Sequence, residues 1–393
     1  MRILDRYILK SFLIPFLYCF FGFIAMWLAF DLAYKTNDLL TNKITTGMLL
    51  YYYGTQMPQY VVFILPVALL LAILFSLSKM SRSNEIISML ASGMSLYRLV
   101  LPLIFAGVAV SGICFAMNYE LAPHAEPSKS ILEVPAGLKG NFFIPDSLLF
   151  RNRADLRTWL LQLKTDQYNP YDRAAHIDLS TVKSIHVTQQ DSQGNILRKY
   201  YAHGISFDPA DKSWIFSDGK TVNFNDLDAA DYTEENWDTL RIKDWSETPW
   251  RIFSTNLDAA NLSVPELRDY LRFNSDFPES QLASYRTYYY YRWAAPASCL
   301  VIVLIATPLG IAYSRRGVLA GVAGSIFIFF GIIFFDKFLL ALGKHGSIPP
   351  VMAAWGTDII FGAVGLFLLY MRAGNRDLLR FHPKNLMHLF KHA

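Results

Sequence analysis

Long apolar runs and short polar stretches alternate along the 393-residue chain. About six of the runs reach the length of roughly 20 residues that a helix needs to cross a bilayer. They are Phe12–Ala33, Pro58–Leu77, Leu99–Tyr119, Tyr290–Tyr313, Val318–Leu342 and Val351–Met371. The pattern predicts a membrane α-helical protein with six transmembrane helices. We expect the first run to be retained, because it is too long for the apolar core of a signal peptide.

A polar stretch of different texture separates the third and fourth runs. It holds short alternating segments such as "STVKSIHVT", "YYAHGISF" and "TVNF", which are broken by "QDSQGN", "DPADKS" and "SDGK". Alternation with closely spaced turn residues predicts antiparallel strands in a sandwich or barrel. Ser263 and Glu266 predict a capping box for a helix that leads back to the membrane. The expected domains are residues 1–119, 120–284 and 285–393.

Basic residues near the ends of the runs predict the orientation in the membrane. Arg and Lys gather before the first run, between the second and third, between the fourth and fifth, and after the last. All four positions fall on one side of a six-span arrangement. Both termini are therefore expected in the cytoplasm, and residues 120–284 on the outer side. Aromatic clusters at Tyr51–Tyr53 and Tyr288–Trp293 fall where the outer interface is expected.

Composition agrees with a membrane protein and argues against several other classes. Hydrophobic residues make up 53% of the chain and charged residues only 17%, and the net charge of +4 is too small to indicate a nucleic-acid partner. Cys19, Cys114 and Cys299 all lie in apolar runs, so the polar domain does not depend on disulfides. No CxxC pair occurs, and no structural metal site is expected.

The polar island "SKMSRSNEIISMLASGMS" predicts a short one-sided helix at about residues 81–93. Ser83 is suited to its N-cap, Glu85 to its first turn and Gly93 to its end. The apolar residues that line one face at helical spacing are Ile86, Met89 and Leu90. A helix lying on the lipid surface is one interpretation. Docking on a partner protein is favoured, because the polar face has few cations and the apolar stripe is short and contains Met.

Several motifs together resemble the LptF/LptG family, the paired permease subunits of the lipopolysaccharide export ABC transporter. The motifs are "LDRYILKSFL", "PQYVVFILPVALLLAILFSLSKMSRSNEIISMLASGMS", "RRGVLAGV" and "HGSIPPVMAAW", together with the β-rich insertion. "LDRY", "FDPADKSW" and "IPP" look more like the G subunit than the F subunit. "WGTD" at Trp355–Asp358 departs from the Pro-Asn pair of relatives and leaves the role of Asp358 open.

The resemblance implies a multi-pass protein of the bacterial inner membrane whose periplasmic β-jellyroll is inserted between the third and fourth spans. A second six-span permease and a dimer of a cytoplasmic ABC ATPase are the implied partners. The short helix is then the coupling helix, and Glu85 matches the glutamate that docks against the ATPase. The jellyroll passes lipopolysaccharide to periplasmic bridge proteins of the same kind.

The chain itself is not expected to hydrolyse ATP or to bind a cofactor, and ATP is used by the partner. The fragment "DGKT" at Asp218–Thr221 resembles part of a phosphate loop, but Trp214 stands where such a loop needs a glycine. We expect a hairpin turn at this fragment. Force must then enter from the partner through the coupling helix.

A lipid with a phosphorylated head needs an apolar cavity with cations near its outer mouth. The candidate cations are Lys35, Lys43, Arg292 and Lys337. Ordinary contact with lipid headgroups is the alternative for the interfacial ones. Lys337 lies inside a span, where an ionisable group usually faces a cavity or a partner, and pairing with Asp336 or Asp31 is its alternative role. The resemblance places the first and fifth spans at lateral gates, which favours Lys35 and Lys337.

Two other functions fit parts of the pattern. A mechanotransmission-type ABC permease acting on periplasmic partners usually carries its outer domain after the first span, whereas here the domain follows the third. A membrane-bound lipid-modifying enzyme needs converging acid–base groups, and the spacing of Asp336, Lys337 and Asp358 predicts no such set. The sequence leaves open whether a single-span subunit joins the complex, and whether the apolar jellyroll residues line a groove or fill a core.

Overall fold

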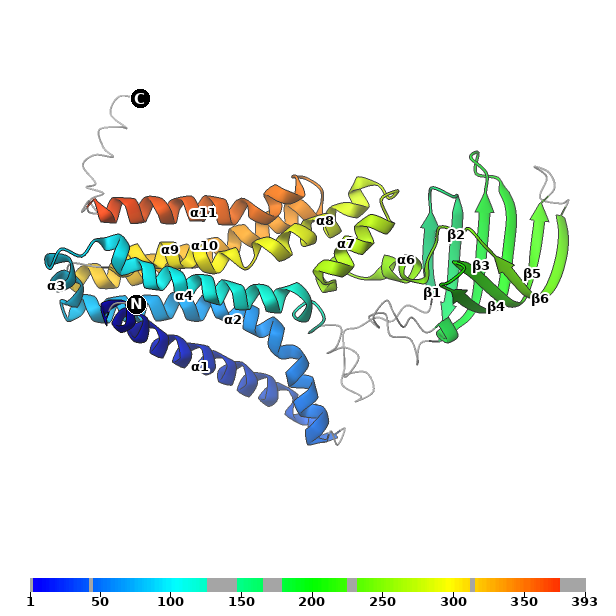
Figure 1. The fold of residues 1–393 in the computed structure, drawn as a ribbon. Coiled ribbons are helices and arrows are strands. Elements are labelled where there is room, and N and C mark those ends of the chain that lie inside the picture. The colour runs from blue at the N-terminus through cyan, green and yellow to red at the C-terminus, as the bar shows by residue number, and fades with distance from the viewer. Residues whose placement is uncertain are drawn as a thin grey trace, which may run out of the picture. The chain divides into compact units, whose positions relative to one another are not determined.

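The computed structural model describes residues 3–41, 45–125, 147–164, 179–224, 232–311 and 315–374. The chain forms two compact units, whose elements are drawn in Figure 1. The helical unit comprises Met1–Asn37, Gln56–Ala122 and Arg286–Ala393. The β unit comprises Asp38–Thr55 and Pro123–Tyr285.

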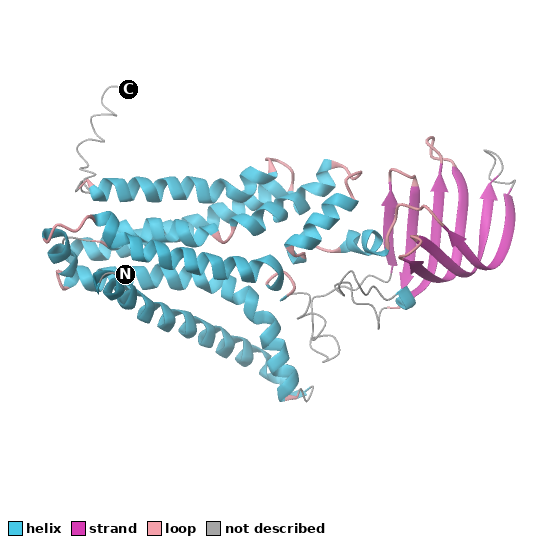
Figure 2. Cartoon of the chain, in the orientation of Figure 1, coloured by secondary structure: helices cyan, strands magenta, loops and turns pink. Residues whose placement is uncertain are grey.

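Long apolar helices build the helical unit (Figure 2). The helices are α1 (Ile3–Thr41), α2 (Thr46–Arg82), α3 (Glu85–Ala91), α4 (Leu96–Ala116, followed by a π-helical turn at Met117–Leu121), α8 (Glu279–Ala294), α9 (Ala297–Gly310), α10 (Arg315–Lys344) and α11 (Pro350–Ala373). Their buried side chains share one hydrophobic core, in which Phe12 of α1, Leu69 of α2 and Val303 of α9 are almost fully enclosed. The helices therefore pack as one bundle.

Five described helices are long and apolar enough to cross a bilayer: Ile3–Lys35, Thr46–Arg82, Leu96–Leu121, Ile326–Lys344 and Pro350–Ala373. A sixth crossing exists if α8 and α9 form one span, which is bent by 51° at the break between them. Pro296 lies at that break. Proline lacks a backbone N–H and its ring clashes with the preceding helical turn, so it interrupts a helix. The predicted membrane helical protein is confirmed with five or six spans, and the predicted span at Tyr290–Tyr313 contains a break at Pro296.

One antiparallel sheet dominates the β unit. Its described strands are β1 (Ser147–Asn152), β2 (Arg157–Leu163), β3 (Val182–Gln190), β4 (Ile196–Asp208), β5 (Ser213–Phe224) and β6 (Tyr232–Ile242). They lie in the order β1-β2-β3-β4-β5-β6, so each strand pairs with its neighbours in sequence. The described strands therefore form a single six-stranded meander, without the second sheet of a sandwich. The inserted β domain is confirmed, and the jellyroll stays a prediction.

The fragment "DGKT" lies inside β5, so the predicted hairpin turn at this point is wrong. Lys220 pairs with Tyr201 of β4 on one side and with Asn236 of β6 on the other. Asp218 adopts a left-handed φ of 52°, yet the pairing with both neighbouring strands resumes at Gly219 in the same register. Asp-Gly is typical of turns, but pairing on both sides stabilises the extended backbone here.

Short helices cover the core of the sheet. They are α6 (Pro249–Phe253) and α7 (Val264–Phe273), with 3-10 turns at Leu179–Thr181, Ser254–Asn256 and Ala259–Asn261. Ile252 and Tyr270 from these helices join Trp159, Trp214 and Phe216 of the strands in one buried cluster. Trp159, Trp214 and Phe216 therefore fill a core, whereas Leu149 and Leu197 of the same sheet are exposed. The predicted capping box of Ser263 and Glu266 is formed at the start of α7.

A buried ion pair fixes the segment that leaves the sheet after β6. The Glu247 side chain is fully enclosed and accepts hydrogen bonds from Arg157 Nε at 2.8 Å and Nη2 at 3.0 Å. Asn152 Nδ2 donates to the same carboxylate at 2.8 Å, and the Trp214 indole N–H donates to the Glu247 carbonyl at 2.9 Å. Three strands thus hold one glutamate, and removing a single partner from such a pair typically costs about 3–5 kcal/mol.

Candidate functional site

The predicted short helix between the second and third spans is present as α3, Glu85–Ala91. It is shorter than the expected range because α2 continues through Arg82. Asn84 precedes it in a left-handed conformation with φ of 58°, which asparagine tolerates better than most residues. Gly93 ends it with φ of 87°, and the N–H groups of Gly93 and Met94 donate back to its last turn. The predicted end at Gly93 is therefore confirmed.

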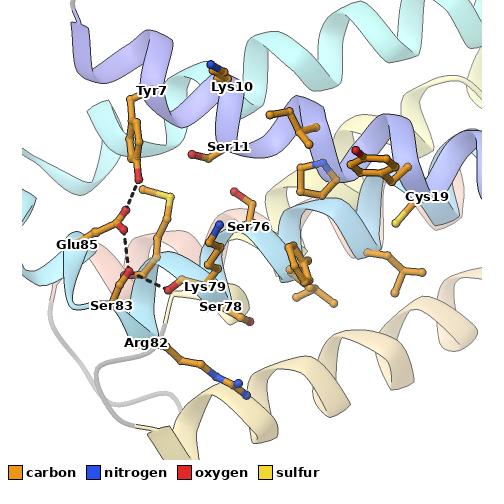
Figure 3. A pocket seen from close by; sticks show the side chains of 17 residues that line it. Tyr7, Lys10, Ser11, Cys19, Ser76, Ser78, Lys79, Arg82, Ser83 and Glu85 are labelled. Carbon is orange, nitrogen blue, oxygen red and sulfur yellow. Dashed lines mark hydrogen bonds between the residues drawn. The ribbon is translucent and has the colours of Figure 1, made fainter.

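Glu85 links α3 to the first helix of the chain (Figure 3). Its carboxylate accepts one hydrogen bond from the Tyr7 hydroxyl at 2.8 Å and another from the Ser83 hydroxyl at 2.8 Å. The Lys79 carbonyl oxygen lies 3.0 Å from the Ser83 hydroxyl and competes for the same proton. No side chain caps the first turn of α3, so Ser83 is not the predicted N-cap. The cap position belongs to Asn84, whose backbone makes the turn. The position of Glu85 is thus fixed from α1 and from the end of α2.

The predicted apolar stripe of α3 faces the bundle. Ile86 is 1% exposed and belongs to the hydrophobic core of the helical unit. Met89 and Leu90 are half-buried against the same core. Ile87, which is off the stripe, is 39% exposed. A helix this short depends on packing for its stability, so its best apolar face stays with its own chain. The outward surface of α3 therefore consists of Ile87 and the small polar residues, with Glu85 at its edge.

A second polar cluster lies between α8, α10 and α11, and it contains Lys337. The Tyr291 hydroxyl donates to Asp336 Oδ2 at 3.0 Å, and Lys337 Nζ donates to the Tyr291 oxygen at 3.2 Å. Lys337 Nζ also lies 3.3 Å from Asp336 Oδ2. The ammonium group is 5.4 Å from the centroid of the Tyr291 ring, within cation–π range. Lys337 therefore pairs with Asp336, the alternative role that the sequence suggested.

These residues border an intramembrane cavity of about 190 Å³. Gln59 and Phe63 of α2 line it together with Asp336, Lys337 and Asp358. The spacing along the chain predicted that the three ionisable residues would not converge, and the structure corrects this. They come together because α10 and α11 are antiparallel neighbours, which the sequence alone does not align.

The other candidate cations have different surroundings. Arg292 is buried, and its Nη1 donates to Asn118 Oδ1 at 3.0 Å while the Asn118 amide donates to the Arg292 carbonyl at 3.1 Å. This reciprocal pair joins α8 to the π-helical turn after α4, and the burial argues against contact with a lipid phosphate. Lys35 lies half-buried near the end of α1 and does not line the cavity beside Lys337. Lys43 lies outside the described residues.

Two contributors to these sites were not identified from the sequence. Tyr7 belongs to the quoted motif "LDRYILKSFL", but nothing in the pattern indicated its contact with Glu85. Tyr291 belongs to an aromatic run that indicated only a membrane interface. Lys344 repeats the Tyr291 arrangement by donating to the Tyr288 hydroxyl at 3.3 Å. The sequence signal for such lysine–tyrosine pairs is a run of tyrosines in one span together with two lysines seven residues apart in another.

The clusters offer charge and hydrogen bonding but no metal centre. Within the described residues, no group of three or more His, Cys, Asp or Glu side chains is arranged to hold a metal ion. Lys337 pairs with Asp336 and Tyr291, and Glu85 with Tyr7.

The family profile described as "Lipopolysaccharide export system permease LptF/LptG" matches residues 6–371. The match includes all of α3, the cluster around Lys337 and the whole described sheet. No curated protein matched the chain.

Proposed function

Because the chain belongs to the LptF/LptG family of lipopolysaccharide export permeases, we propose that it is one permease half of an ATP-driven lipid extractor. It takes lipopolysaccharide from the inner membrane and passes it through the β unit to periplasmic bridge proteins. The family match over residues 6–371 is the observation that carries this proposal. A second six-span permease completes the lipid chamber, and a cytoplasmic ATPase dimer supplies the energy.

The proposed topology has six spans with both termini in the cytoplasm. Five described helices cross the membrane singly, and α8 with α9 makes the remaining crossing as a broken span. Arg82 and Arg98 flank α3. Lys344 is the last residue of α10 and lies beside the tyrosines of α8, at the membrane side opposite to α3 in this topology. The higher density of basic residues around α3 supports a cytoplasmic position for it. In this topology the β unit is periplasmic, where it is proposed to form a jellyroll.

Coupling to the ATPase is proposed to run through α3. Glu85 is held by Tyr7 and Ser83, so a partner that pulls on this carboxylate also pulls on α1. Ile86 anchors α3 in the bundle core, which makes the helix part of the moving body. Nucleotide states of the partner shift the permease only if they contact α3 differently. The exposed surface that a partner reaches contains Glu85 and Ile87, with Met89 and Leu90 half-buried beside them.

The coupling role predicts that Glu85→Ala weakens ATPase docking, because it removes a carboxylate that the partner's basic groups would contact. We expect recovery of the ATPase with the purified permease to fall by about tenfold, equivalent to roughly 1.4 kcal/mol. The measurement is co-purification of tagged permease from membrane, together with lipopolysaccharide-stimulated ATP hydrolysis.

Ser88→Ala is the matched control. Ser88 is exposed on the same helix, and its hydroxyl only returns to the Asn84 carbonyl at 3.0 Å. Tyr7→Phe separates positioning from charge, since it keeps Glu85 and removes one of its donors. Unchanged ATPase recovery and unchanged hydrolysis with Glu85→Ala would refute the docking role of Glu85.

A further inference from the structure

A groove between α1 and α2 opens beside α3 (Figure 3). Its volume is about 1260 Å³, and its apolar wall includes Ile14 of α1 with Leu71 and Phe75 of α2. Ile14 is 46% exposed and Phe75 is 60% exposed, so the wall is uncovered within the described part of the chain. A groove of this size and character fits hydrocarbon chains.

The end of the groove nearest α3 is positively charged. Lys10 of α1 and Lys79 and Arg82 of α2 line it, and Glu85 is the one carboxylate in its described lining. Glu85 accepts its hydrogen bonds from hydroxyl groups, and none of the ion pairs among described residues involves Lys10, Lys79 or Arg82. Three cations against one carboxylate leave an excess positive charge at this end.

Buried hydroxyl groups provide a second, independent indication of a ligand. Ser76 is only 2% exposed and lines the groove, yet its Oγ has no hydrogen-bond partner. Ser78 borders the groove from another side of α2, and its Oγ is also buried without a partner. A buried hydroxyl without a partner is unfavourable, so each of these groups is better explained by a partner that binds in the groove.

We propose that this groove binds one anionic glycerophospholipid, with its phosphate at Lys79 and an acyl chain along Ile14 and Phe75, while Lys10 and Arg82 add positive charge on either side. Lysine and arginine are the usual phosphate-binding residues, and their stems also cover apolar surface. The Ser76 hydroxyl, which points toward α1, is supplied to the glycerol region. The occupant is a bulk membrane lipid rather than the transported glycolipid, so the inference goes beyond the proposed function.

A lipid in this groove affects the proposed coupling to the ATPase, because the groove borders Glu85. Tyr7, Ser83 and Glu85 belong to the same lining, so a bound phosphate lies next to the carboxylate proposed to dock the ATPase. Charge on the lipid head therefore acts on Glu85 and on the connection between α1 and α3. Lipid composition then adjusts how firmly α3 is held.

The test measures lipid retention by the full chain, purified with the subunits that accompany it. Native mass spectrometry follows titration with phosphatidylglycerol or phosphatidylcholine. We expect one tightly retained phosphatidylglycerol per chain, and about tenfold weaker retention when Lys10→Gln, Lys79→Gln and Arg82→Gln are combined. The control combines Arg6→Gln and Arg98→Gln, two basic residues on α1 and α4 that do not line the groove, and it should retain the lipid normally.

The single variant Lys79→Gln serves if the triple variant does not fold, and it should weaken retention by a smaller factor. Equal retention by wild type and by the folded Lys79→Gln variant would overturn the proposal. Equal preference for phosphatidylcholine, or full competition by millimolar inorganic phosphate, would also overturn it, because the site would then not recognise an anionic lipid. None of these readouts requires transport, so failure of the lipid site is distinguishable from failure of the permease function.

Discussion

At the scale of single residues, the most informative group is Lys337 with its two partners. A cation inside a span is costly unless it is paired or hydrated, and here Asp336 and Tyr291 provide the pairing. The Lys337 side chain is still 63% exposed, so pairing does not remove it from reach of a substrate. Lys337 can therefore exchange Asp336 for a lipid phosphate, while the Asp336 carboxylate keeps the hydrogen bond from the Tyr291 hydroxyl. With this exchange, the predicted phosphate-binding role of Lys337 is consistent with its pairing to Asp336.

The exchange predicts that Lys337→Glu impairs transfer of lipopolysaccharide, because it places another carboxylate beside Asp336 and Asp358 and removes the phosphate partner. We expect transfer from reconstituted vesicles to a soluble acceptor to fall by about tenfold, with assembly intact. Lys344→Gln is the control, since Lys344 has a similar tyrosine contact and no carboxylate partner among the described residues. Normal transfer by Lys337→Glu would count against the role.

At the scale of elements, the start of α7 shows how one carboxylate organises a helix. Glu266 Oε2 accepts from the Ser263 backbone N–H at 2.8 Å, and His124 Nε2 lies 2.8 Å from the same oxygen. Burial acts to raise the pKa of Glu266. The hydrogen bond and charge of His124 and the hydrogen bonds from Ser263 outweigh burial, so the pKa lies below its ordinary value of 4.5.

A lowered pKa in the folded state contributes stability above the unfolded-state value, and this stability is lost as pH falls through the folded-state value. We therefore predict that wild type loses about 1 kcal/mol more than Glu266→Gln between neutral pH and pH values below 4.5. Thermal unfolding of the purified chain across that range checks it. Glu235→Gln, at an exposed position of β6, should behave as wild type. An equal loss of stability at acid pH in wild type and Glu266→Gln would contradict the lowered pKa of Glu266.

The elements also show what the sequence predicts and where it stops. Apolar run length located the spans because a bilayer sets the length of a helix. Pro296 was visible, but whether a proline bends a span depends on the helices packed around it. Periodicity correctly placed Ile86 on the apolar face of a short helix. It did not show that this face packs on the helical unit of the same chain instead of on a partner. Tyr291 was missed because its partner Asp336 lies on another helix.

At the scale of the whole molecule, the family and the membrane class follow from motifs and runs, while the sidedness stays a prediction. Single cysteines test it after Cys19, Cys114 and Cys299 are replaced. Ser88→Cys on α3 should resist a membrane-impermeant maleimide in cells with a permeable outer membrane. Ser347→Cys, between α10 and α11, should react. The reverse pattern would place α3 in the periplasm and overturn the proposed coupling.

The meander order of the sheet has a consequence for how the chain is assembled. Each described strand pairs with the described strand before it in sequence, so the sheet is built from contacts between neighbouring strands and forms quickly once its strands have emerged. The bundle behaves differently, because Gly107 of α4 packs against Val303 of α9, which is synthesised almost 200 residues later. The first three spans therefore enter the lipid before α9 is made, so part of their helix-packing surface stays uncovered while the sheet folds. A membrane chaperone would bind the chain in that interval.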